Sequence, residues 1–68
     1  MIRTPLLLDA IQIKGYTQRG LAKEIGISKN GLNNKIHGRN EFTAVEIKMI
    51  TDTLQLTDRQ VMEIFFSR

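Results

Sequence analysis

The sequence predicts an all-α fold of five short helices. Three observations lead to this prediction. A Ser or Thr stands before nearly every segment in which apolar residues recur at helical spacing, and a Gly follows each of the first three such segments. No segment alternates apolar and polar residues in the manner of a strand. With 68 residues, 41% of them hydrophobic, we expect residues 1–68 to form one compact domain around a single core.

The first helix is expected over residues 5–14. Thr4 is predicted to cap it, because a Thr hydroxyl there accepts one of the backbone N–H groups that the first turn leaves unpaired. Pro5 suits the first helical position, where its missing N–H is not needed, and Gly15 supplies a left-handed exit. Three apolar residues are predicted to face the core: Leu7, Leu8 and Ile11.

The second and third helices follow each other with only a tight turn between them. The second is expected to begin after the cap Thr17 and to end at Gly26. The third is expected to begin after the cap Ser28 and to run to His37, where Gly38 closes it. A helix of about eight residues, a Gly-containing turn and a second helix of about ten are typical of a helix-turn-helix. We therefore predict this motif between residues 18 and 38.

The fourth and fifth helices are each expected to open with a capping box, in which a Thr hydroxyl and the side chain three residues later satisfy each other's backbone donors. The two pairs are Thr43 with Glu46, and Thr57 with Gln60. Apolar residues then recur at helical spacing, as Val45, Ile47, Met49, Ile50 and Leu54 in the fourth helix and as Val61, Met62, Ile64, Phe65 and Phe66 in the fifth.

The third helix has one narrow apolar edge, made by Leu32 and Ile36. With that edge turned inward, Asn30 and Asn34 point most nearly outward, and Asn33 flanks them. Asn is a poor helix former, which indicates that something other than helix stability selected these residues. A helix with one buried edge can enter the major groove of double-stranded DNA, which is about 12 Å wide.

Composition excludes several classes of function. The chain has no Cys and one His, so a disulfide, a thiolate metal site and a zinc cluster are not expected. No Ser/His/Asp, Cys/His or paired-carboxylate arrangement is visible, and we expect no enzyme, cofactor or small-molecule effector. The longest apolar run, residues 6–8, is far shorter than the roughly 20 residues that span a bilayer. The sequence is that expected of a soluble, unprocessed cytoplasmic protein.

Charge is distributed unevenly along the chain. The formal net charge is +3, which alone is a weak argument for a nucleic-acid partner. Residues 1–40, however, carry seven basic and two acidic side chains, whereas residues 41–68 carry three basic and five acidic ones. This split indicates that the first part faces a polyanion and that the second serves as scaffold or partner surface.

Seven residues stand at positions characteristic of one family: Gln18, Ala22, Gly26, Ile27, Ser28, Leu32 and Gly38. Over roughly residues 4–56 the chain resembles the Cro and phage-repressor class of helix-turn-helix proteins, also called the Xre-like family. Segments 35–39, 42–43 and 46–47 are similar to small Cro-like regulators of Gram-positive prophages. The resemblance implies a compact five-helix lambda-repressor-like DNA-binding domain and a transcriptional regulator, most simply a repressor. Lys35 departs from the family, where this position is usually apolar, so the rotation of the third helix stays open.

The resemblance and the helical spacing together assign eight residues to DNA: Gln18, Ser28, Lys29, Asn30, Asn33, Asn34, Arg39 and Asn40. Gln18 would anchor a phosphate at the start of its helix, and Ser28 would bind a phosphate as well as cap. Lys29 can reach guanine O6 and N7, and an Asn can pair with adenine N6 and N7. Arg39 and Asn40 follow the third helix, where related proteins touch the backbone, and Arg39 can also reach toward the minor groove. For each residue the alternative is an ordinary solvated side chain.

One recognition helix reads only about four or five base pairs, so we expect a homodimer on a pseudo-palindromic operator, formed either in solution or only on DNA. Met62 and Phe66 lie off the main stripe of the fifth helix and are candidates for the contact, although core burial would explain them equally well. The alternative class of function is a helical protein-interaction module, such as an antitoxin-like or regulatory partner-binding domain. The operator sequence and the regulated genes do not follow from these residues.

Overall fold

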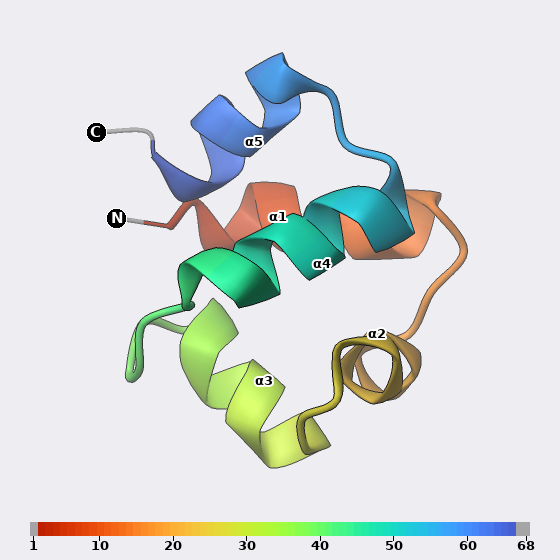
Figure 1. The fold of residues 1–68 in the computed structure, drawn as a ribbon, viewed down its shortest axis with the longest axis vertical. Coiled ribbons are helices and arrows are strands. Elements are labelled where there is room, and N and C mark those ends of the chain that lie inside the picture. Colours follow the sequence, from red (N-terminus) through yellow and green to blue (C-terminus); the bar gives the residue numbers. More distant parts are fainter. Residues whose placement is uncertain (1, 67–68) are drawn as a thin grey trace.

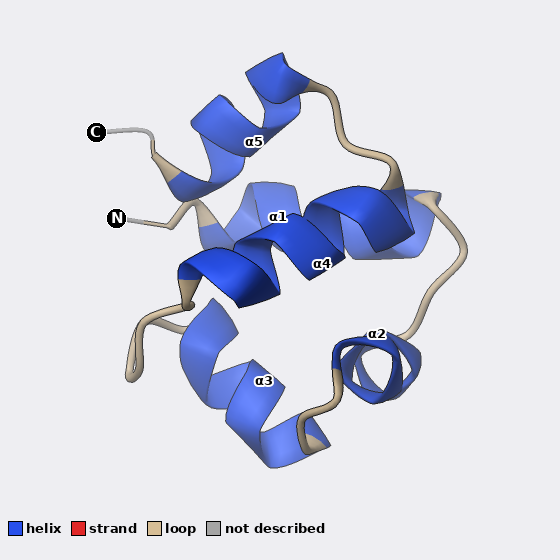
Figure 2. Ribbon diagram, viewed as in Figure 1, coloured by secondary structure: helices blue, strands red, loops and turns tan. Residues whose placement is uncertain are grey.

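The computed structural model describes residues 2–66, and within them it contains five α-helices and no strand (Figure 1, Figure 2). The helices are α1 (Thr4–Ile13), α2 (Gln18–Ile25), α3 (Lys29–Ile36), α4 (Ala44–Leu54) and α5 (Asp58–Phe65). The predicted all-α class and the order of the five helices are confirmed. The described chain is compact, with principal extents of 26 × 25 × 21 Å.

The helices pack around one apolar core, with α2 against α3 and α4, and α1 against α5. Six side chains from the first four helices are fully buried: Leu7, Leu21, Leu32, Ile36, Ile50 and Leu54. Full burial of such a side chain contributes about 1.5–3 kcal/mol to folding. α5 adds Ile64 and Phe65, and the Phe65 ring meets the Phe42 ring edge to face, with centroids 5.5 Å apart. The core therefore joins all five helices to the loop before α4.

Four of the predicted N-caps are present. Thr17 and Ser28 each accept a hydrogen bond of 2.9 Å from the backbone N–H three residues later. Thr43 and Thr57 do the same at 3.1 Å, and Glu46 and Gln60 accept in return from the two Thr backbone N–H groups, which completes both capping boxes. These bonds set where α2, α3, α4 and α5 begin.

The prediction that Thr4 caps the first helix was wrong. α1 begins at Thr4 itself, and the residue at its N-cap, Arg3, makes no side-chain cap. The Thr4 hydroxyl instead donates to the carbonyl oxygen of Ile36, at 2.6 Å, and the Arg3 N–H donates to the Ile64 carbonyl oxygen, at 2.8 Å. The start of α1 is thus tied to the last turn of α3 and to α5, which is a tertiary role that a local pattern does not indicate.

Four helices end with the same hydrogen-bonding pattern, in which the chain reverses through a residue of positive φ and the next N–H bonds to a carbonyl five residues back. In α1, α2 and α3 the residue of positive φ is the predicted Gly15, Gly26 or Gly38, with φ of 84°, 78° and 81°. In α4 it is Gln55, with φ of 53°, and the Leu56 N–H bonds to the Thr51 carbonyl oxygen at 3.0 Å. Gln55 therefore adopts the left-handed conformation, which is unfavourable for any residue that has a Cβ.

We expect Gln55→Gly to raise the free energy of unfolding by about 0.5–1 kcal/mol, because relief of the left-handed strain exceeds the added entropy of the unfolded chain. Urea denaturation followed by circular dichroism measures the change. Gly15→Ala is the matched control, since it places a Cβ in the same conformation and should lower the stability. An unchanged or lower midpoint for Gln55→Gly would contradict the strain argument.

Candidate nucleic-acid interface

α3 is held to the molecule by one edge. Leu32 and Ile36 have no exposed surface, as the sequence predicted, and they are the only two buried residues of α3. α2 packs against α3, and the two helices are joined by the turn at Gly26 (Figure 1). The remaining sides of α3 carry polar residues and one Gly, so a polar face is left outward.

The eight residues predicted to contact DNA all keep exposed surface. Gln18, Asn33 and Asn34 are half-buried, whereas the other five are exposed, namely Ser28, Lys29, Asn30, Arg39 and Asn40. Seven of the eight lie on α3 or directly beside it, and Gln18 is the first residue of α2. Asn34 accepts hydrogen bonds from both Arg39 and Asn40. The structure therefore gathers seven of these residues around α3 and places Gln18 on the helix that packs against it.

Gly31, at the third position of α3, is not explained by packing within the chain. A Cβ at Gly31 would meet only the Ser28 hydroxyl oxygen, at 3.1 Å, and no other part of the described chain within 4 Å. Glu46 and Gln60 occupy the same position of α4 and α5 and carry long side chains beside the same kind of cap. The cap therefore does not require a Gly, and the bare backbone at Gly31 leaves room for an approach from outside.

The rotation of α3 is fixed by an ion pair that sequence reasoning missed. Ile36 faces the core, and the neighbouring Lys35 Nζ lies 2.5 Å from both carboxylate oxygens of Glu46. The two side chains are only 17% and 13% exposed. Glu46 had been identified solely as half of a capping box. The sequence does contain an indication of this pair: Lys35 stands next to the buried Ile36, and a charged side chain near the core requires an opposite charge nearby.

Glu46 also has a shifted pKa. Burial acts to raise the pKa of this carboxyl, but hydrogen bonds from the Lys35 ammonium and the Thr43 N–H, together with the attraction of the Lys35 charge, hold the pKa below its usual 4.5. Because this folded-state pKa lies below the value in the unfolded chain, the ionised carboxylate stabilises the fold at neutral pH. That contribution is lost as the pH falls through the folded-state pKa.

We expect Glu46→Gln to lower the free energy of unfolding at pH 7 by about 1–3 kcal/mol, because Lys35 is left half-buried without its partner. The cap itself should survive, since Gln60 performs the same role in α5. Chemical denaturation at a series of pH values should also show a shallower loss of stability for the variant as the pH falls below the usual Glu pKa of 4.5. Glu63→Gln, at an exposed ion pair with N···O of 3.8 Å, is the control and should have little effect. Parallel pH curves for Glu46→Gln and the parent would exclude this role for Glu46.

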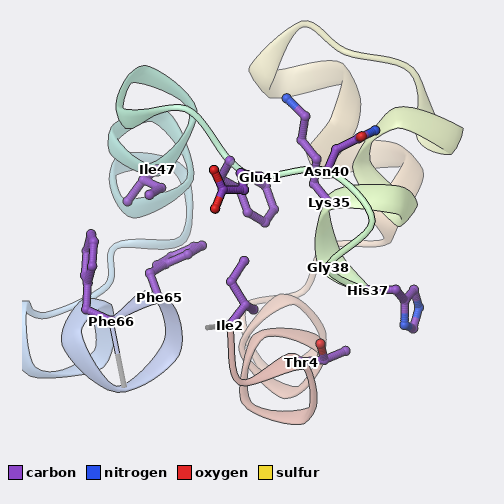
Figure 3. A pocket seen from close by; sticks show the side chains of 11 residues that line it. Ile2, Thr4, Lys35, His37, Gly38, Asn40, Glu41, Ile47, Phe65 and Phe66 are labelled. Carbon is purple, nitrogen blue, oxygen red and sulfur yellow. The ribbon is translucent and has the colours of Figure 1, made fainter. Parts of the chain in front are cut away.

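A hollow of about 690 Å³ lies beside the end of α3 (Figure 3). Its apolar side is formed by residues of the N-terminal segment, α4 and α5, and includes Ile47, Phe65 and Phe66. His37 is on its rim and points away from these side chains (Figure 3). The hollow is lined by Lys35 and His37 at the end of α3 and by Phe65 and Phe66 at the end of α5.

α5 carries apolar side chains that the core does not cover. Met62 is 58% exposed and Phe66 is 54% exposed, whereas Ile64 and Phe65 are buried. The explanation of Met62 and Phe66 as core residues was therefore wrong. They lie one helical turn apart and present an apolar strip to solvent.

Comparison with known proteins identifies no family. No protein-family model matches the sequence, and no curated protein matches it. Within residues 2–66, no helix has the length and apolar character needed to cross a bilayer. In the same part of the chain, no three side chains of the metal-binding types lie close enough to share an ion. What the polar face of α3 does must be inferred from its geometry and charge.

Proposed function

We propose that this chain is a sequence-specific, double-stranded-DNA-binding transcriptional regulator of the helix-turn-helix class, with a lambda-repressor-like fold. The observation that carries the proposal is the outer face of α3. Asn30 is exposed and Asn34 half-buried on that face, opposite the buried edge of Leu32 and Ile36. Amide side chains pair with base edges through matched donors and acceptors.

The dimensions of α3 suit the major groove. An α-helix with its side chains is about 10–12 Å across, and the groove is about 12 Å wide. α2 packs against α3. Gln18 is the first residue of α2, and at this end of the helix the dipole and the unpaired N–H groups favour binding of a phosphate. The first turn of α3 carries the exposed Lys29 and the bare backbone of Gly31, which allow close approach to a base or a phosphate.

The charges on α2, on α3 and in the loop after α3 also favour DNA. Lys35 is neutralised by Glu46, but Arg19 and Lys23 of α2, Lys29 of α3 and Arg39 of the loop are exposed. Each cation that neutralises a phosphate releases a counterion, so affinity should fall steeply with salt. Repression would follow from occupation of a promoter.

The same proposal includes a homodimer on a pseudo-palindromic operator with half-sites about 34 Å apart, since one α3 reads too few base pairs for specificity. The apolar strip of Met62 and Phe66 supports this part, because it offers a second copy an uncovered surface. Sedimentation of the chain on palindromic DNA tests it: two protomers for each operator are expected, and one protomer would refute the dimer.

Asn30→Ala tests the reading of bases by α3. On duplexes selected from a random pool, we expect this variant to lose discrimination at one base pair of each half-site by about 1–3 kcal/mol, as measured by binding titrations on single-substitution duplexes. Gln12→Ala, an exposed residue of α1, is the control and should leave every position unchanged. If the chain is instead a protein-interaction module, no duplex should be enriched from the pool, and any weak binding to DNA should not depend on the DNA sequence.

A further inference from the structure

The first residues of the loop after α3 are bonded to the last turn of that helix. Because Gly38 has a φ of 81°, the Arg39 N–H reaches the Asn34 carbonyl oxygen at 2.9 Å, and the Asn40 N–H reaches the same oxygen at 3.4 Å. The Gly38 N–H bonds in turn to the Lys35 carbonyl oxygen at 3.2 Å. These backbone bonds fix the backbone of Arg39 and Asn40 at the last turn of α3, close to Asn34.

The side chains of the two residues are also joined. Arg39 Nη1 donates to Asn34 Oδ1 at 3.2 Å. A guanidinium has donors only, so the amide atom that faces it must be the oxygen. The Asn34 NH₂ group therefore points away from Arg39 and keeps both of its donors free.

We propose that Asn34 and Arg39 act as one donor-only unit that selects guanine, through its acceptors O6 and N7, over adenine. The inference rests on the proposed function. An Asn that reads adenine must accept from N6 with Oδ1 and donate to N7. Here Oδ1 already accepts from Arg39, and a base amino group that approached its second lone pair would bring its hydrogens against the guanidinium charge. Guanine instead offers two acceptors to the free N–H groups of both side chains.

Asn30 and Asn33 provide an internal comparison. In the described part of the chain neither side chain makes a hydrogen bond, so each amide keeps both a donor and an acceptor. Pairing with adenine remains open to them. The unit of Asn34 and Arg39 thus differs from Asn30 and Asn33 on the same helix in that its amide oxygen is already bonded.

A phosphate is also acceptor-only, and the experiment must separate it from guanine. Duplexes are selected from a random pool with the parent chain and with Arg39→Ala, and binding is titrated on duplexes with G, A or 7-deazaguanine at each guanine, or with a neutral methylphosphonate at each phosphate. For the parent we expect one guanine in each half-site where adenine or 7-deazaguanine costs about tenfold or more. For Arg39→Ala we expect the preference at that position to move toward adenine, because Asn34 regains its acceptor.

A second variant, Asn34→Asp, removes the free donors and keeps the acceptor for Arg39. We expect it to lose the preference for guanine at the same position and to leave the base pair read by Asn30 unchanged. If Arg39→Ala weakens all duplexes equally and keeps the ratio of guanine to adenine, or if only a methylphosphonate reproduces the loss, the unit contacts a phosphate and the inference is overturned while the proposed function stands. If the parent selects no sequence at all, both fail together.

Discussion

The arrangement of the whole molecule depends on the burial of one narrow edge of α3. Leu32 and Ile36 have no exposed surface, and their burial holds a short helix that would be marginal in isolation. Two polar contacts fix the angle at which that edge is buried: the Thr4 hydroxyl on the Ile36 carbonyl oxygen, and Lys35 on Glu46. Because nothing else on α3 is fully buried, its opposite face stays accessible, with the Asn30 amide unbonded and the Asn34 oxygen accepting from Arg39.

Glu46 connects the start of α4 to α3 and neutralises the charge of Lys35. Its carboxylate accepts from the Thr43 N–H at the start of α4 and from the Lys35 ammonium of α3, so one group sets both the beginning of one helix and the rotation of another. It also cancels the one cation of α3 that lies beside the core. The positive charge left outward near α3 then comes from Lys29 and Arg39, at its two ends.

The features that the sequence predicted are those determined within a few residues. The cap at Thr17 and the exit at Gly26 depend on bonds that span at most five residues, and the same holds for the other caps and Gly exits. The missed features join distant residues, as in the bond from Thr4 to a residue 32 positions away. Local spacing also could not separate buried from exposed apolar positions, so it left Met62 undecided. The outward placement of Asn30 and Asn34 follows from the inward edge of α3, whereas Gln18 and the residues beside α3 were assigned with the help of the resemblance; all eight keep exposed surface, and their contact with DNA stays a prediction.

The proposed function requires the outer face of α3 to meet double-stranded DNA. Backbone amide chemical shifts of the folded chain, followed by NMR during titration with a selected duplex, test it most directly. We expect the largest saturable shifts at the start of α2, in α3 and at residues 39 and 40, smaller shifts near Met62 and Phe66 where the dimer forms only on DNA, and little change in α1. Shifts centred on α1 or α5, or no shift with any duplex, would contradict it.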